Sequence, residues 1–124
     1  MTLGPALSTP TVTIASTTPY VRLRAVLSRQ AEYDRFFNAQ FTQSGTTSRT
    51  VAIEATAAYV GTGAFDVTIP DFAAAQYDAS WGLRTGTPVT WALGAYGWSA
   101  GAGVATPQAG VTTRNANKAG QITP

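Results

Sequence analysis

The acidic side chains are the first candidates for chemistry, because paired carboxylates can act as general acid and base. Glu32 and Asp34 are close in the sequence, and Asp66, Asp71 and Asp78 follow at wider intervals. Two carboxylates at the right separation hydrolyse glycosides, and several converging carboxylates bind calcium. No Asp-x-Asp-x-Asp spacing is present, and aspartates between strands commonly stabilise turns. We therefore expect these residues to stabilise turns, with no metal site.

Nucleophilic catalysis lacks its usual partners in this chain. There is no cysteine and no histidine, so the thiolate nucleophile and the commonest general base are both absent. No imidazole is present to activate a serine such as Ser28 or Ser99. The glycines of residues 94–103 precede no Lys-Ser/Thr pair of a phosphate-binding loop. We expect no enzymatic activity, no catalytic residues and no cofactor.

Four aromatic residues are stronger candidates for binding. Tyr77, Trp81, Tyr96 and Trp98 lie in or next to expected loops, and exposed aromatic faces anchor partners or stack on sugars. Tyr96 and Trp98 alternate with Trp91, so in an extended strand they face away from the core. The competing interpretation is packing, with Trp81 as a plug beneath its crossover and Trp98 as a cover over the end of the fold.

The elements that would position these residues are short strands. Apolar and polar residues alternate with a period of two, and the alternating segments are separated by Gly, Pro, Ser and Thr. The expected strands are residues 11–16, 20–27, 33–43, 49–60, 64–72 and 87–98, with a weaker edge strand in 111–124. Residues 71–83 form a long crossover with a short helical turn. This pattern predicts an all-β, antiparallel β-sandwich of about seven strands, with a barrel as the alternative.

Length and charge limit the domain organisation and the kinds of partner that the chain can have. We expect residues 1–10 to form an N-terminal extension and residues 11–124 to form a single sandwich domain. The net charge is only +2 and the basic residues are scattered, which argues against a nucleic-acid partner. No apolar run reaches the roughly 18 residues of a membrane span. The first residues also lack the basic and apolar regions of a signal peptide.

One segment carries a resemblance to a known family. Residues 83–95 have the sequence LRTGTPVTWALGA, which is similar to the Leu-x-Pro-Gly-Thr-x-Tyr pattern at the sixth strand of fibronectin type III modules. Leu83, Gly86 and Thr87 match this pattern, while Thr85 and Val89 replace its proline and its corner tyrosine. The alternation that follows places Trp91 inward, between two stacked sheets.

The chain thus resembles a divergent fibronectin type III-like or immunoglobulin-like module of bacterial secreted or surface proteins. The resemblance implies a non-catalytic structural spacer or binding unit of an extracellular or cell-surface assembly, with a protein partner or like subunits. Two other functions stay open. One is a structural subunit of a virion or extracellular filament, and the other is a carbohydrate-binding module that uses Tyr96 and Trp98.

Overall fold

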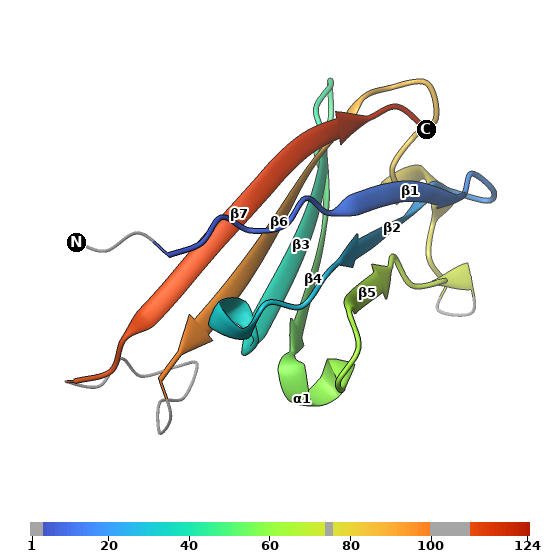
Figure 1. The fold of residues 1–124 in the computed structure, drawn as a ribbon. Helices are drawn as coiled ribbons and strands as arrows, with labels where there is room; N and C mark the ends of the chain where they lie inside the picture. The colour runs from blue at the N-terminus through green and yellow to red at the C-terminus, as the bar shows by residue number, and fades with distance from the viewer. Residues whose placement is uncertain (1–3, 74–75, 100–109) are drawn as a thin grey trace.

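The computed structural model describes residues 4–73, 76–99 and 110–124, which form two antiparallel sheets packed face to face (Figure 1). The first sheet has the order β1-β2-β5 and consists of β1 (Thr11–Ser16), β2 (Arg22–Leu27) and β5 (Phe65–Thr68). The second has the order β4-β3-β6-β7 and consists of β3 (Phe36–Gln43), β4 (Arg49–Thr56), β6 (Val89–Trp98) and β7 (Thr113–Ile122). The expected all-β, antiparallel architecture is confirmed.

The core lies between the sheets because alternate residues of the strands point inward. The inward residues of β2 and β3 are almost entirely buried; they are Leu23, Ala25, Leu27, Phe37, Ala39 and Phe41. Phe37 of one sheet stacks on Phe65 of the other, with ring centroids 4.7 Å apart. Burial of each large side chain contributes about 1.5–3 kcal/mol. The period-two pattern of the sequence is therefore the main determinant of this core.

Strand β6 follows the expected alternation, with one difference at Trp91. Val89 and Leu93 are fully buried, whereas Trp91 on the same face is only half-buried. Its indole lies over Gly120, the residue opposite it in β7, and a Cβ at position 120 would collide with the indole ring. Trp91 therefore packs against the margin of the core, toward the edge of the four-stranded sheet.

Strand β7 is longer than the sequence pattern indicates. It pairs with β6 along ten consecutive residue pairs, from Val89↔Ile122 to Trp98↔Thr113. It is the last strand of its sheet, so backbone hydrogen bonds and small inward residues suffice to hold it. Lys118 is opposite Leu93 and therefore lies on the inward side of this edge strand, half-buried.

Short helical turns shorten two of the expected strands. Residues 57–60, expected to continue a strand, form α1 (Ala57–Val60), because the Thr56 side chain accepts the Tyr59 N–H and begins a helix there. The strand expected from residue 33 begins at Phe36, after η1 (Ala31–Tyr33). The helical turn expected in the crossover is present as η3 (Ala79–Trp81). Most of the expected 99–110 loop lies outside the described residues.

The two described ends of the chain lie toward opposite ends of the sandwich (Figure 1). Residues 4–10 run across the fold before β1 and pack on it. Leu7 is buried in the core, and the Tyr33 hydroxyl donates a hydrogen bond to the Pro5 carbonyl at 2.6 Å. This segment therefore contributes to the sandwich.

Candidate functional site

Aromatic side chains gather on the crossover between β5 and β6. The Tyr77 ring lies 5.0 Å from Tyr20, 5.2 Å from Phe72 and 5.8 Å from Trp81, measured between ring centroids. The pairs with Tyr20 and Trp81 have edge-to-face geometry, which is favourable for aromatic rings. Burial raises the pKa of the Tyr77 phenol. Tyr77 is thus the packed centre of the cluster, and it supports Trp81 from one side.

Tyr20 and Asp71 fix the start of this crossover. The Tyr20 hydroxyl donates to Asp71 Oδ1 at 2.9 Å and accepts the Phe72 N–H. Asp71 also accepts the Ala73 N–H at 3.0 Å. These two bonds, the one from Ala73 above all, lower the pKa of the Asp71 carboxyl. The aromatic cluster therefore rests on a hydrogen-bonded backbone.

Trp81 is exposed, so the expectation that it plugs the crossover is wrong. Its exposed fraction is 64%. The space beneath the crossover is already occupied, because Tyr20 is buried there and a Cβ at Gly82 would come within 2.9 Å of the Tyr20 Cβ. Asp78 begins the turn by accepting the Ser80 N–H at 2.8 Å, which also lowers the pKa of its carboxyl. The turn then presents the indole to solvent.

A cleft of about 430 Å³ opens beside Trp81. The hairpin between β3 and β4 and the crossover line it, with Thr47, Ser48, Arg49, Thr50, Ser80, Trp81 and Arg84. The Arg49 guanidinium joins the two sides, since its Nε and Nη2 donate to the Ser80 carbonyl at 3.2 and 3.0 Å. The cleft thus combines an exposed indole with two guanidinium groups and several hydroxyls.

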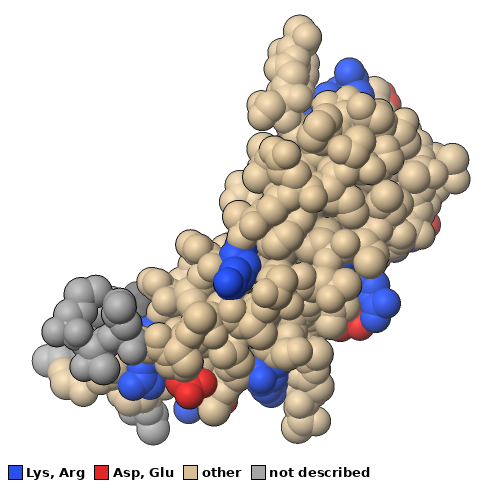
Figure 2. Space-filling model, turned by 45° about the horizontal axis from the view of Figure 1, so that its top comes forward, with Lys and Arg blue, Asp and Glu red and all other residues tan. Residues whose placement is uncertain are grey.

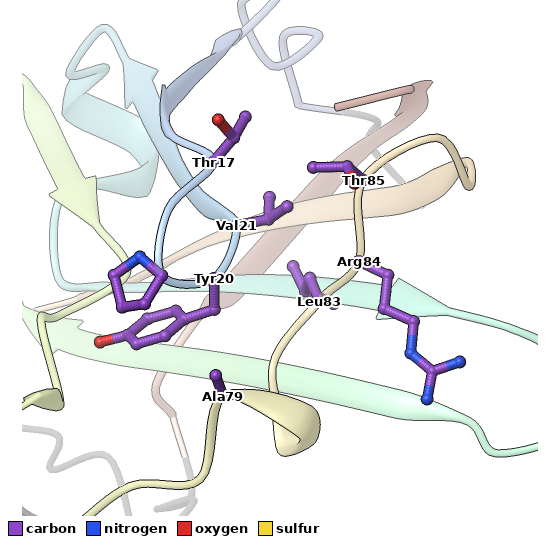
Figure 3. A pocket seen from close by; sticks show the side chains of 8 residues that line it. Thr17, Tyr20, Val21, Ala79, Leu83, Arg84 and Thr85 are labelled. Atoms are coloured by element: carbon purple, nitrogen blue, oxygen red, sulfur yellow. The ribbon is translucent and has the colours of Figure 1, made fainter.

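Gln43 positions the backbone of Arg84 at the rim of this cleft. The Gln43 side chain is buried at the end of β3. Its amide nitrogen donates to the carbonyls of Arg84 and Thr87, both at 2.9 Å, and its amide oxygen accepts the Arg84 N–H at 2.8 Å. Arg84 also borders a neighbouring pocket of about 350 Å³, where its side chain extends away from Tyr20 (Figure 3).

A second aromatic group lies on the outer face of the four-stranded sheet. Tyr96 and Trp98 point outward from β6, as their alternation predicts, and both are half-buried. Phe36 of β3 is opposite Tyr96, with ring centroids 5.5 Å apart. Phe36 was not among the residues predicted from the sequence, because the alternation was followed along the inward series of β3, which contains Phe37. The even spacing of Phe36 from the outward residues of β3 was the available signal.

The outer face around these three rings is almost free of charge. In the described strands, Glu54 is its only charged residue, whereas Arg49, Arg114 and Lys118 alternate to the other side. Figure 2 shows one side of the molecule, on which charged groups are scattered and some blue and red groups touch. The outward positions are otherwise held by aromatic, amide, hydroxyl and small residues: Phe36, Asn38, Gln40, Thr42, Thr50, Ala52, Thr56, Thr90, Ala92, Gly94, Tyr96, Trp98, Thr113, Asn115, Asn117, Ala119 and Gln121.

The acidic residues are separate and serve local structure. In the part of the chain that the structure describes, no three Asp or Glu side chains gather as metal ligands would. Asp66 pairs with Arg24 at 2.8 Å from Nε to Oδ1, and this hydrogen bond lowers the pKa of the Asp66 carboxyl. Glu54, in contrast, belongs to the other sheet and does not pair with Arg24.

Ser99 lies in the sequence Gly-Trp-Ser-Ala-Gly, the spacing of a nucleophile elbow, which sequence reasoning overlooked. In the structure its hydroxyl accepts the Thr112 N–H at 3.2 Å, and its own N–H donates to the Thr112 carbonyl at 3.0 Å. Ser99 therefore closes the ladder between β6 and β7. A serine nucleophile needs a base, and the chain contains no histidine.

Comparisons with protein-family models, curated proteins and solved structures find no match to this chain. No helix within residues 4–73, 76–99 and 110–124 is long and apolar enough to cross a membrane.

Proposed function

We propose that this chain is a non-catalytic β-sandwich module, similar to fibronectin type III and immunoglobulin modules, that works as a structural spacer or binding unit of a bacterial extracellular or cell-surface assembly. The single observation that carries the proposal is the strand order. The first, second and fifth strands form one sheet, and the third, sixth and seventh belong to the other. Immunoglobulin domains have the same division; here the fourth strand pairs with the third.

Two further features support this proposal. The segment that resembles the family, residues 83–95, enters the sixth strand, as it does in fibronectin type III modules. The described ends of the chain lie toward opposite ends of the sandwich (Figure 1). A module of this shape sets a distance between whatever is joined to its two ends.

The test of the spacer proposal is hydrolase assays combined with light scattering of the purified chain. We expect no turnover of common glycoside, ester or peptide substrates, and a monomer at high protein concentration. Turnover of any of these substrates contradicts the non-catalytic proposal. A concentration-dependent polymer favours the alternative of a virion or filament subunit.

A second candidate function is binding of a neutral carbohydrate on the outer face of the four-stranded sheet. The observation that favours it is the set of Phe36, Tyr96 and Trp98 on a face with one charged residue. Aromatic rings offer flat apolar surfaces to sugar rings. The amides of Asn and Gln both donate and accept hydrogen bonds, as sugar hydroxyls do. A face without cations suits a ligand without charge.

Trp98→Ala tests this second function. We expect affinity for neutral polysaccharides, measured by affinity electrophoresis, to fall about tenfold, because an aromatic anchor contributes at least about 1.4 kcal/mol. Tyr59→Ala is the matched control, since Tyr59 is 86% exposed on α1, outside the strands that form this face. Equal binding by both variants, or no binding by the unmodified chain, rejects the carbohydrate function and leaves the spacer proposal intact.

A further inference from the structure

We propose that the cleft beside Trp81 binds a saccharide unit that carries a carboxylate. The cleft is formed by the β3–β4 hairpin and the crossover, and it has a volume of about 430 Å³. This volume lies within the range of small-ligand sites, about 300–1,000 Å³. None of the outer-face rings, Phe36, Tyr96 and Trp98, lines this cleft, so the proposal does not depend on the function proposed for that face.

The charge of the cleft selects an anion. Arg49 and Arg84 both line it, and neither forms an ion pair with a carboxylate among residues 4–73, 76–99 and 110–124. The nearest acid along the chain, Asp78, is not a lining residue, and its carboxylate accepts the Ser80 N–H. Two uncompensated guanidinium groups in one cleft attract a negatively charged group. Carboxylate is the simplest partner, because it matches the donor geometry of arginine.

The two arginines have different roles in this site. The Arg49 guanidinium already donates to the carbonyls of Ser80 and Thr47, which holds its charge in place. The Arg84 side chain makes no hydrogen bond within the described residues, although Gln43 fixes its backbone. Arg84 is therefore the guanidinium whose donors are available to a ligand, and its anchored backbone reduces the entropy lost on binding.

The exposed indole selects a ligand with an apolar face. Trp81 is 64% exposed, yet its orientation is set by Tyr77, which is itself packed against Tyr20 and Phe72. An aromatic ring that is both exposed and held in place is a preorganised stacking surface. A pyranose ring has such a face, formed by its C–H groups, next to the hydroxyls at its edge.

The rest of the lining favours a sugar over an acidic peptide. Thr47, Ser48, Thr50 and Ser80 supply hydroxyls that donate and accept hydrogen bonds with a polyhydroxylated ligand. A bound peptide needs pockets for its side chains, and among the described residues Trp81 is the only apolar side chain that lines the cleft. A uronic acid unit combines all three features that the cleft recognises.

The experiment is calorimetric titration of the full chain with a polygalacturonate oligosaccharide. We expect binding that weakens about tenfold in Trp81→Ala and in Arg84→Gln, as for aromatic and arginine anchors. We also expect it to weaken with added sodium chloride, because the arginines are near the surface. Tyr59→Ala and Arg24→Gln are controls outside the cleft, an exposed aromatic residue and a half-exposed arginine, and both should bind like the unmodified chain. Circular dichroism and thermal unfolding check that each variant is folded.

Three results would overturn the proposal. The first is no binding of the oligouronate by the folded chain. The second is equal binding of the methyl-esterified oligosaccharide, which has the same ring without the charge. The third is binding of polyglutamate that depends on Arg84 and not on Trp81, which would assign the cleft to acidic peptides. A failure of the Trp98→Ala prediction leaves this site unaffected, because the two ligands differ in charge and none of the outer-face rings, Phe36, Tyr96 and Trp98, lines the cleft.

Discussion

Replacement of Gly97 by alanine should lower the free energy of unfolding by about 3 kcal/mol, the upper end of the usual cost of overpacking. A Cβ at position 97 would collide with the Glu32 carbonyl and would also lie 3.3 Å from the Tyr33 Cα. These are backbone atoms of η1, so no side-chain rotation relieves the contact. The turn cannot move away freely, because the Tyr33 hydroxyl is bonded to Pro5 and the Arg35 N–H donates to the Tyr96 carbonyl at 2.9 Å.

Urea unfolding followed by tryptophan fluorescence measures this effect, and Gly63→Ala is the control. Nothing lies within 4 Å of a Cβ at Gly63, and its φ is not positive. We expect that variant to differ from the unmodified chain by less than about 0.5 kcal/mol. If Gly97→Ala is equally neutral, η1 is not packed against β6 as the structure describes.

Replacement of Gln43 by methionine is the second large change, with an expected loss of about 3 kcal/mol. Methionine has nearly the same shape, so the core stays filled, but it cannot replace the three amide hydrogen bonds. The N–H of Arg84 and the carbonyls of Arg84 and Thr87 would then be left without their partner beside a buried side chain. Amide hydrogen exchange of the Arg84 N–H should accelerate together with the loss of stability.

Gln40→Met is the matched control, because Gln40 is in the same strand but exposed on the outer face. Its free energy of unfolding should change by less than about 0.5 kcal/mol. A Gln43→Met variant as stable as this control would show that the turn at residues 84–87 is held by other contacts.

The sequence predicts which residues of a strand face inward and which face outward. It does not predict which strands lie next to each other in a sheet. Alternation is a local property, so it correctly separates Leu93 from Tyr96 in β6. Sheet order is a long-range property. It determines that Arg24 meets Asp66 and that Phe36 lies opposite Tyr96, and no spacing in the sequence encodes either pair.

The cleft was the least predictable feature for the same reason. Trp81 was expected to be buried because large aromatic residues in crossovers usually are. In the structure Tyr20 fills that position, and its hydroxyl forms hydrogen bonds with the Asp71 carboxylate and the Phe72 N–H. Arg49 and Arg84 line one cleft because a hairpin and a crossover, far apart in the sequence, are joined at Ser80. Gln43, which holds the Arg84 backbone, follows the inward alternation of β3 but is polar.

The position of Lys118 has a consequence for self-association. An unpaired strand edge is a template for aggregation, because a foreign strand can continue the sheet by its backbone hydrogen bonds. A foreign strand paired with β7 would crowd the Lys118 ammonium and remove water from it. No carboxylate lies opposite to compensate, since the residue of β6 that pairs with Lys118 is Leu93. One amine thus lies on β7, the longest edge strand in the described part of the chain, and a fibre that grows by strand addition there would first have to compensate its charge.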